Sequence, residues 1–215
     1  MDRLVVGLTG TFGSGKSTVG RLLKRFGAQR VIDCDRLVEQ ALRVDVGIRA
    51  KIRDLFDIKG RINRQAIAEV VFRNIRKRKQ LEAIIHPYVF KAIDSDLRRI
   101  PKGIVILEVP LLFETGFDRR CDMTMAVTAG KRAIVDRLRR LGFEHSEIEA
   151  RMRAQWTEHR KKRSADLWIS NSGSKQDLVR RTKSIWKKVL TESNQGTMRH
   201  SETVSARRTQ RNRGW

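Results

Sequence analysis

One short segment, Gly7 to Thr18, concentrates residue types that bind phosphate; it reads GLTGTFGSGKST. From Gly10 to Ser17 it matches the pattern G-x-x-x-x-G-K-[ST], with an apolar run before it and a helical pattern after it. Glycines let backbone N–H groups close around phosphate oxygens, Lys16 adds a positive charge for the β- and γ-phosphates, and Ser17 offers a hydroxyl to Mg²⁺. The segment therefore predicts a site for a nucleoside triphosphate. Its expected contacts are Gly10, Gly13, Ser14, Gly15, Lys16, Ser17 and Thr18.

Two carboxylates follow the next apolar run, in the segment VIDCD that ends at Asp35. The carboxyl ends of parallel strands face the ligand crevice in open sheets. Asp33, at the end of the predicted strand, is therefore expected to be the base that accepts a proton from an attacking hydroxyl. Asp35 is expected to cap a helix that begins near Leu37, although either carboxylate could take the other role.

Glu108 ends a third apolar run, IVIL. A carboxylate at this point fits a role like that of a Walker B acid, which holds Mg²⁺ directly or through a water molecule. A solvated charge at the end of a strand is the alternative. Ser17 and Glu108 are therefore the residues expected to hold the metal ion.

Five short apolar runs read as buried strands, and helical patterns of apolar residues separate them. The predicted strands are 3–8, 30–33, 103–109, 122–127 and 166–170. The predicted helices are 16–26, 64–74, 88–99, 131–141, 147–159 and 175–190. Continuous apolar strands that alternate with helices are typical of a parallel sheet with helices on both faces. The sequence therefore predicts an α/β fold around a five-stranded parallel sheet.

Two insertions interrupt the pattern that forms the sheet. One is largely helical and covers about 37–101, and the other is very basic and covers 131–163. Neither is needed to build the sheet, so both are candidates for added function. After Leu190 the periodic pattern stops, and 191–215 are predicted to form a disordered basic tail.

The charge of the chain is lopsided: 47 Lys and Arg against 24 Asp and Glu give a net charge of +23 over 215 residues. Such a charge favours polyanions without choosing among nucleotides, nucleic acid and acidic membranes. The basic tail predicts weak, non-specific contact with nucleic acid that salt would weaken. Two cysteines, no signal-like N-terminus and no apolar run near the roughly 20 residues of a membrane helix predict a cytoplasmic protein without a membrane partner. The oligomeric state stays open.

Six segments in a fixed order make the chain resemble the dephospho-CoA kinase family. They are GLTGTFGSGKST, VIDCD, LEAIIHPYV from Leu81, VPLLFETG from Val109, DRLRRLGFEHSEIEARMRAQ from Asp136 and ADLWISNSGS from Ala165. Together they span about residues 4–186. The chain departs from the family pattern at Thr11 and Phe12, where a Gly-Ile pair is usual, and at Glu108, where Asp is usual.

The resemblance implies transfer of the ATP γ-phosphoryl group, with Mg²⁺, to the ribose 3′-hydroxyl of dephospho-CoA, the final step of coenzyme A synthesis. It also implies a P-loop NTPase-type fold with a helical substrate-binding insertion and a helical lid. The implied parts are a nucleotide core of 1–36, 102–130 and 164–190, an acceptor-substrate domain of 37–101, and an Arg-rich lid of 131–163.

The resemblance also implies roles for single residues outside the loop. Arg140, in the lid, is expected to stabilise negative charge in the transition state, as a guanidinium can when the lid excludes water. Asn171 is expected near the adenine, with a plain strand–helix turn that carries a Ser or Asn cap as the alternative. His86, next to a Pro87 that would turn the chain, is expected to bind substrate phosphate or ribose, with a structural histidine as the alternative. The residues expected to line the acceptor pocket, or else to be ordinary core, are Pro110, Leu111 and Leu112.

Two other functions stay open on the sequence alone. One is a different P-loop kinase, acting on a nucleoside, a nucleoside monophosphate or a small metabolite; the segments HP and PLLFE argue against it. The other is a nucleic-acid-binding ATPase, but aromatic residues make up only 6% of the chain, and no stacking platform or helix-turn-helix motif is evident. A GTPase is excluded because the sequence contains no N-K-x-D segment.

Overall fold

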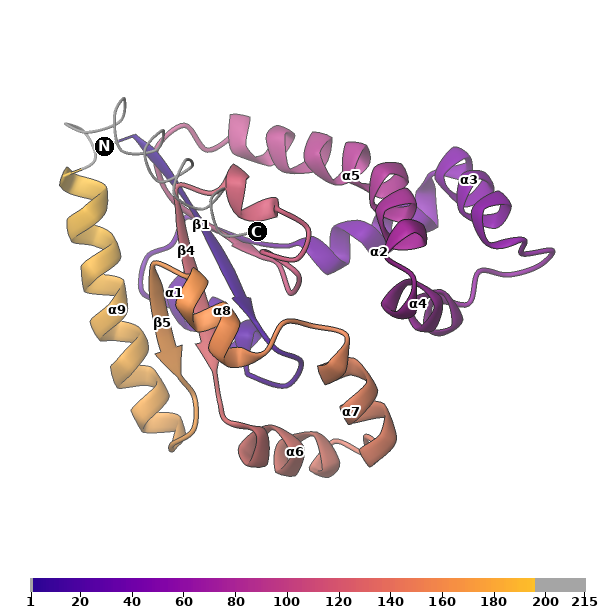
Figure 1. The fold of residues 1–215 in the computed structure, drawn as a ribbon. Coiled ribbons are helices and arrows are strands. Elements are labelled where there is room, and N and C mark those ends of the chain that lie inside the picture. The colour runs from indigo at the N-terminus through magenta and orange to yellow at the C-terminus, as the bar shows by residue number, and fades with distance from the viewer. Residues whose placement is uncertain (1, 196–215) are drawn as a thin grey trace. The chain divides into compact units, whose positions relative to one another are not determined.

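The structure, a computed structural model, describes residues 2–195 apart from five side chains. Those five belong to Arg64, Gln65, Phe72, Arg73 and Gln195. The chain forms two compact units, one built from 1–32 with 100–215 and the other from 33–99. The first unit is built around the β-sheet, and the described residues of the second form helices and their connections (Figure 1).

A five-stranded parallel sheet forms the centre of the first unit, with the strand order β2-β3-β1-β4-β5. The strands are β1 (Arg3–Gly10), β2 (Arg30–Asp33), β3 (Gly103–Glu108), β4 (Met123–Thr128) and β5 (Leu167–Ser170). β1 lies in the middle, where Val6 pairs with Ile106 on one side and Met123 on the other. Each predicted strand is present within two residues of its predicted ends, and the predicted parallel sheet is confirmed.

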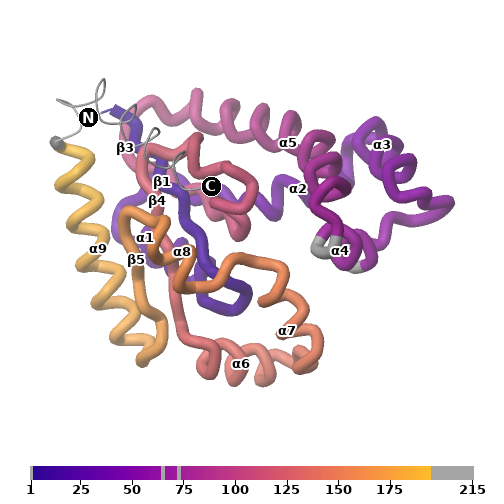
Figure 2. Tube along the Cα trace, in the orientation of Figure 1, coloured from indigo at the N-terminus to yellow at the C-terminus, as the bar shows by residue number. Residues whose placement is uncertain are grey.

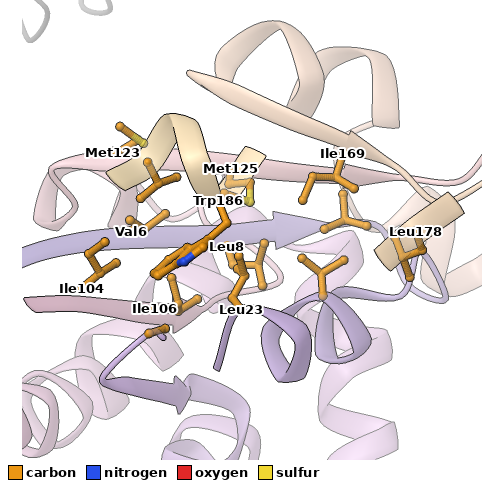
Figure 3. Close-up of a cluster of buried hydrophobic side chains, with 14 residues drawn as sticks. Val6, Leu8, Leu23, Ile104, Ile106, Met123, Met125, Ile169, Leu178 and Trp186 are labelled. Carbon is orange, nitrogen blue, oxygen red and sulfur yellow. The ribbon is translucent and has the colours of Figure 1, made fainter. Parts of the chain in front are cut away.

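Helices α1 (Lys16–Arg25) and α9 (Lys175–Gln195) pack with the sheet around one apolar core. Figure 3 shows Trp186 of α9 among strand residues such as Val6 and Leu8. Complete burial of an aliphatic side chain contributes about 1.5–3 kcal/mol, and Leu8 is 0% exposed. The core therefore anchors β1, and the glycine-rich loop follows directly at the end of that strand.

Three further helices of the first unit follow β4. They are α6 (Lys131–Arg140), α7 (His145–Arg153) and α8 (Glu158–Ser164). A second apolar cluster joins α6 and α7 through Ile134, Leu138 and Ile148. A short 3₁₀ helix, η1 (Phe117–Arg120), lies between β3 and β4.

The single helix predicted over 147–159 is wrong, because the chain forms two helices there. The Thr157 side chain accepts a hydrogen bond from the Arg160 N–H at 3.3 Å and caps α8. A threonine in this position satisfies a backbone N–H that a helix start leaves without an intrahelical partner. The cap therefore begins a new helix where the apolar periodicity alone suggested a continuous one.

Four helices make up the second unit: α2 (Cys34–Val44), α3 (Val46–Phe56), α4 (Arg64–Arg73) and α5 (Ile75–Arg98). α5 contacts each of the other three, and Figure 2 traces it beside them within this unit. Its buried residues Ile85, Val89 and Ile93 recur every four positions, so they form one stripe. The stripe gives the unit an apolar core of its own.

Two predictions about α5 are wrong. The helix was expected over 88–99 with Pro87 turning the chain before it, yet Pro87 lies inside a helix that begins at Ile75. A proline inside a helix removes one backbone hydrogen bond and costs about 3 kcal/mol or more. Burial of Ile85 and Val89 on either side of Pro87 offsets this cost.

The end of α9 also differs from the prediction. The helix was expected to stop at 190 but continues to Gln195, and Ser193 is buried within it. Residues 191–195 are therefore helical rather than part of a disordered tail. The remainder of the predicted tail, 196–215, and the nucleic-acid contact assigned to it lie outside the described residues. Between residues 2 and 195, no helix is long and apolar enough to span a bilayer.

Candidate active site

The glycine-rich loop connects β1 to α1 and depends on glycine at two positions. Gly13 and Gly15 have φ angles of 76° and 95°, in the left-handed region that favours glycine. A Cβ on Gly13 would lie 2.8 Å from Leu138 Cδ1, and one on Gly15 would collide with the Asn171 amide. The loop backbone can therefore hold this shape only with glycines, which also leaves its amides open to a phosphate.

Lys16 and Ser14 lie within the same loop. The Lys16 ammonium donates to the carbonyl oxygens of Gly10 at 2.9 Å and Thr11 at 3.3 Å. Ser14 is 0% exposed, and its hydroxyl oxygen has no hydrogen-bond partner among the residues that the structure describes. Buried polar atoms are nearly always satisfied, so an orphaned hydroxyl in a phosphate-binding loop fits a site completed by a ligand.

Ser17 and Glu108 meet at the first turn of α1. The Ser17 hydroxyl donates to Glu108 Oε1 at 2.6 Å, and Glu108 is only 7% exposed. Hydroxyl and carboxylate oxygens are ligands that suit Mg²⁺, which takes few protein ligands and keeps water and substrate phosphates as the others. Among the residues described, no group of three or more His, Cys, Asp or Glu side chains could hold a metal ion by itself. The pair fits a metal ion that arrives with a nucleotide.

Asn171, predicted to lie near the adenine, follows β5 and contacts the loop. Its side-chain N–H donates to the Ser14 carbonyl at 2.8 Å, and its backbone N–H donates to Thr128 at 2.6 Å. Arg137 of α6 adds a second connection, because its guanidinium donates to the carbonyls of Gly13 at 2.6 Å and Asn171 at 3.2 Å. The ends of β1 and β5 and the helix α6 thus meet at one loop.

Arg140 does not make the loop contact. It lies exposed in the last turn of α6, whereas Arg137 of the same helix reaches the glycine-rich loop. The sequence did contain a signal for this difference. Arg137 lies three residues after Ile134 and next to Leu138, the two apolar residues that pack on Gly13, so it shares their face of the helix.

The unusual Phe12 is the point where α7 docks on the loop. Its ring meets the Phe143 ring edge-on at 5.2 Å, and the Arg151 guanidinium lies 4.6 Å from its centre. Its backbone N–H donates to the Gln155 side chain at 2.9 Å. Glu158 adds a further contact by accepting the backbone N–H groups of the turn that leads into α6, at 2.7 and 2.9 Å. The sequence alone left the effect of Phe12 open. These contacts show that Phe12 packs the loop against Phe143 and α7.

A buried ion pair lies behind the loop, and sequence reasoning missed it. Lys161 of α8 is 0% exposed, and its ammonium lies 2.7 Å from a Glu114 carboxylate oxygen. It also donates to the Pro110 carbonyl at 2.7 Å, while Glu114 accepts the Trp156 backbone N–H at 2.8 Å. Burial lowers the pKa of Lys161, and the charge of Glu114 opposes that shift. The pair ties the segment after β3 to α8.

The predicted acceptor-pocket residues differ in burial. Leu112 is fully buried, which fits its alternative as core, whereas Pro110 and Leu111 are partly exposed. The Pro110 carbonyl also accepts from the Thr9 hydroxyl at 3.0 Å. The segment after β3 is therefore fixed to the end of β1, whatever it binds.

Asp33, not Asp35, caps α2, so the cap predicted for Asp35 is wrong. Oδ1 of Asp33 accepts the backbone N–H groups of Asp35 at 3.0 Å and Arg36 at 3.2 Å. The helix begins at Cys34, three residues earlier than expected, which moves the cap to the strand end. Oδ2 of Asp33 has no hydrogen-bond partner among the described residues, so the base predicted at this position keeps one oxygen available.

His86 lies on α5 in the second unit. It is half-buried, its ring lies 5.1 Å from the Phe90 ring, and burial lowers its pKa. A neutral imidazole can still donate or accept one hydrogen bond. Both its predicted contact with substrate and its structural alternative are compatible with this placement.

The fold and loop define the class of protein. A parallel sheet carries a glycine-rich loop from its central strand to a helix, with a lysine in the loop and a serine bonded to a buried strand-end carboxylate. This arrangement, with helical insertions on a short chain, is that of a P-loop kinase.

Comparison with known proteins gives the family. The sequence profile of dephospho-CoA kinases matches residues 4–177. The dephospho-CoA kinase of Thermus thermophilus is 38% identical over 186 residues, which cover 85% of this chain and 90% of that protein. A crystal structure from the same organism aligns with a TM-score of 0.76 at 36% identity, covering 89% of this chain and 98% of the other. The chain belongs to the dephospho-CoA kinase family, as its six segments predicted, and is an ATP-dependent kinase.

A more distant structure agrees in fold. The dephospho-CoA kinase from Campylobacter jejuni aligns with a TM-score of 0.61 at 23% identity, covering 91% of this chain and all of the other. The P-loop NTPase-type fold predicted from the loop and the strands is confirmed.

Proposed function

We propose that the protein transfers the γ-phosphoryl group of ATP to the ribose 3′-hydroxyl of dephospho-CoA, giving coenzyme A and ADP. The observation that carries the proposal is the hydrogen bond of 2.6 Å from the exposed Ser17 hydroxyl to the buried Glu108 carboxylate, beside the glycine-rich loop. Such a pair suits a metal-bound triphosphate, and membership of the family supplies the acceptor.

On the donor side, the loop amides bind the β- and γ-phosphates, and Lys16 offsets the negative charge that develops on the transferred group. Ser17 and Glu108 hold Mg²⁺, with Glu108 acting directly or through a water molecule. When bound there, the ion would offset the negative charge of the phosphates. Asn171 stays next to the loop on the nucleotide side, supported by its hydrogen bond to Ser14.

On the acceptor side, Asp33 accepts the proton of the attacking hydroxyl. Its position at the end of β2 and its available Oδ2 support this role. In the helical unit of 33–99, His86 is the proposed contact for the acceptor. In the other unit, Pro110, Leu111 and Leu112 of the segment after β3 are the proposed acceptor contacts. The bounds of this unit lie close to those expected for the substrate domain.

The lid of 131–163 supplies positive charge. Arg137 already bonds the loop, which supports a role in holding the nucleotide site together. Arg140, exposed at the end of α6, remains the proposed group for charge in the transition state. We place the enzyme in the cytoplasm, a proposal that the thiol state of Cys34 and Cys121 supports.

The test is formation of coenzyme A by the purified protein from ATP, Mg²⁺ and dephospho-CoA. AMP, CMP and shikimate serve as alternative acceptors, and ADP release is measured with each. We expect turnover with dephospho-CoA at least about 10²-fold above that with the other acceptors, as polar recognition of a whole substrate permits. Equal or greater turnover with another acceptor, or ADP release that only nucleic acid stimulates, would contradict the proposal.

A further inference from the structure

Four arginines and two apolar residues line a pocket of the second unit. It has a volume of about 330 Å³ and lies between the end of α2, the helix α3 and the connection that leads to α4. Its lining residues are Leu42, Arg43, Arg49, Arg53, Arg61 and Ile62, which we call the arginine pocket. All six belong to the compact unit of 33–99.

Two of the arginines are held in place by the backbone. Nη1 of Arg49 donates to the carbonyls of Leu42 at 3.1 Å and Arg43 at 2.6 Å, at the end of α2. Nε of Arg53 donates to the Gly60 carbonyl at 3.2 Å. A guanidinium carries five N–H donors, so Arg49 keeps its Nε and Nη2 donors, and Arg53 keeps those of both terminal nitrogens. The backbone thus orients these two groups without using up their capacity.

The charges of the pocket have no acidic partner. No carboxylate within the described part of the chain forms an ion pair with Arg43, Arg49, Arg53 or Arg61, and Arg43 and Arg61 make no side-chain hydrogen bond there. Four like charges around one hollow repel one another, and nothing in the wall of the pocket offsets this repulsion. A bound anion would remove that cost.

The shape and chemistry of the pocket select among anions. Planar guanidinium groups match phosphoryl oxygens in paired hydrogen bonds, and a diphosphate offers oxygens to more than one guanidinium at a time. Leu42 and Ile62 add apolar wall beside the charges, which suits the organic part of a phosphate ester. The volume is at the lower end of that of small-molecule sites in proteins.

We infer that the arginine pocket binds the diphosphate group of an organic ligand. The ligand has two possible sources. It is the acceptor dephospho-CoA itself, in which case the inference rests on the proposed function, or it is a separate diphosphate-bearing effector. Binding of a diphosphate is tested first, and whether the ligand is dephospho-CoA or an effector is tested second.

Binding is measured by calorimetry on the full chain, with Mg²⁺ and a non-hydrolysable ATP analogue filling the glycine-rich loop, and with inorganic pyrophosphate as the titrant. The test variant is Arg43→Gln/Arg61→Gln, because neither side chain supports the fold through a hydrogen bond. The matched control is Arg98→Gln/Arg99→Gln, which removes the same charge from two exposed residues at the end of α5. Melting temperatures of all three proteins are compared, and Arg43→Lys/Arg61→Lys serves as a second test variant that keeps the charge.

We expect pyrophosphate to bind the wild-type protein and the control within about twofold of each other. The glutamine variant should bind at least about tenfold more weakly, since it loses charge-assisted hydrogen bonds to phosphoryl oxygens, and the lysine variant should fall between them. Absence of binding to the wild-type protein, or equal binding to all four, would overturn the inference. A loss that the control shares would also overturn it, because the effect would then be one of net charge alone.

Enzyme kinetics then distinguish the acceptor dephospho-CoA from a separate effector as the ligand of the arginine pocket. If the glutamine variant raises KM for dephospho-CoA by about tenfold and leaves KM for ATP unchanged, the pocket holds the diphosphate of the acceptor. If pyrophosphate binding falls while both KM values stay the same, the pocket holds a separate effector. A wild-type protein that makes no coenzyme A but still binds pyrophosphate through these arginines would refute the proposed function and leave the arginine pocket standing.

Discussion

Positive charge is held differently around the glycine-rich loop and in the arginine pocket. In the unit that carries the sheet, Lys16, Arg137 and Lys161 each donate to backbone carbonyls or a carboxylate near the glycine-rich loop. In the unit of 33–99, Arg43 and Arg61 have no such partner among the described residues. The cations beside the glycine-rich loop are thus held before a ligand arrives, whereas in the arginine pocket backbone carbonyls hold Arg49 and Arg53 but not Arg43 and Arg61. Preorganised groups cost no rearrangement during reaction, which suits a loop with a phosphate-binding motif.

The strongest test of this comparison is Lys16→Ala, which removes the charge at the centre of the loop. We expect kcat to fall on the order of 10³-fold, because a positioned group that stabilises transition-state charge typically contributes 10²–10³-fold. The fold should persist, since the hydrogen bonds of the Lys16 ammonium to Gly10 and Thr11 lie within its own loop. Turnover and circular dichroism measure the two effects, and a folded variant with near-normal turnover would show that the loop has another purpose.

Asp33→Asn tests a residue that has a structural and a proposed chemical role at once. Asparagine caps helices as well as aspartate does, so the melting temperature should hardly change, but an amide cannot accept a proton. We expect kcat to fall about 10²-fold, in the lower part of the range for general-base assistance, because phosphoryl transfer depends mainly on electrostatics. ATP affinity, measured separately, should persist.

Asp35→Asn is the control for that experiment, since Asp35 lies in the first turn of α2 but does not cap it. This substitution should lower the free energy of unfolding by only a few tenths of a kcal/mol, because a negative charge near the helix N-terminus is lost. An inactive Asp35→Asn beside an active Asp33→Asn would mean that the other carboxylate is the base.

The buried ion pair tests whether the nucleotide side depends on matched charges. Lys161→Met leaves Glu114 buried without its cation, so the free energy of unfolding should fall by about 3–5 kcal/mol. Adding Glu114→Gln should recover part of this loss, because the amide oxygen can still accept from the Trp156 N–H. Arg163→Met, at an exposed position of the same helix, is the control and should change little. Urea unfolding of these four proteins and of Glu114→Gln alone measures the coupling, and losses of the two single variants that simply add in the double variant would show that the two charges act independently.

The sequence predicted the parts of the molecule that local pattern decides. The strands are continuous apolar runs, and the loop motif requires its glycines locally, so both were identified correctly along with the family. The pattern of apolar residues did not predict helix starts that a single capping side chain determines. Thr157 begins a new helix, and Asp33 rather than Asp35 caps α2.

The contacts that the sequence did not predict are long-range ones. Lys161 and Glu114 lie 47 residues apart, and nothing near either residue distinguishes it from an exposed charge. Arg137 shares a helix face with Ile134 and Leu138, a signal that the sequence contains, but only the packing of α6 on Gly13 shows that this face meets the loop. The positive charge of 131–163 could thus be predicted, whereas the arginine that reaches the loop needed both this face and the fold.

We expect the smallest effect on stability from His86. It compares a buried ionisable group of the helical unit with Lys161 of the other unit. Lys161 is desolvated with a carboxylate beside it, whereas burial alone accounts for the lowered pKa of His86. Because the pKa is lower in the folded chain, the unfolded chain takes up a proton at a higher pH, near 6.5. Stability should therefore rise with pH between the folded-state pKa and about 6.5, and this contribution should be constant above that window.

We expect His86→Gln to flatten that slope, which is shallow because the ring is half exposed. The measurement is urea unfolding between pH 5 and pH 8 for the wild type, His86→Gln and an exposed control, His159→Gln. Burial raises the pKa of Glu82, one turn earlier on α5, and its titration acts in the opposite direction at lower pH. The difference between proteins, not the absolute slope, therefore reports on His86. The same slope in all three proteins would mean that desolvation of this ring does not contribute to the pH dependence of folding.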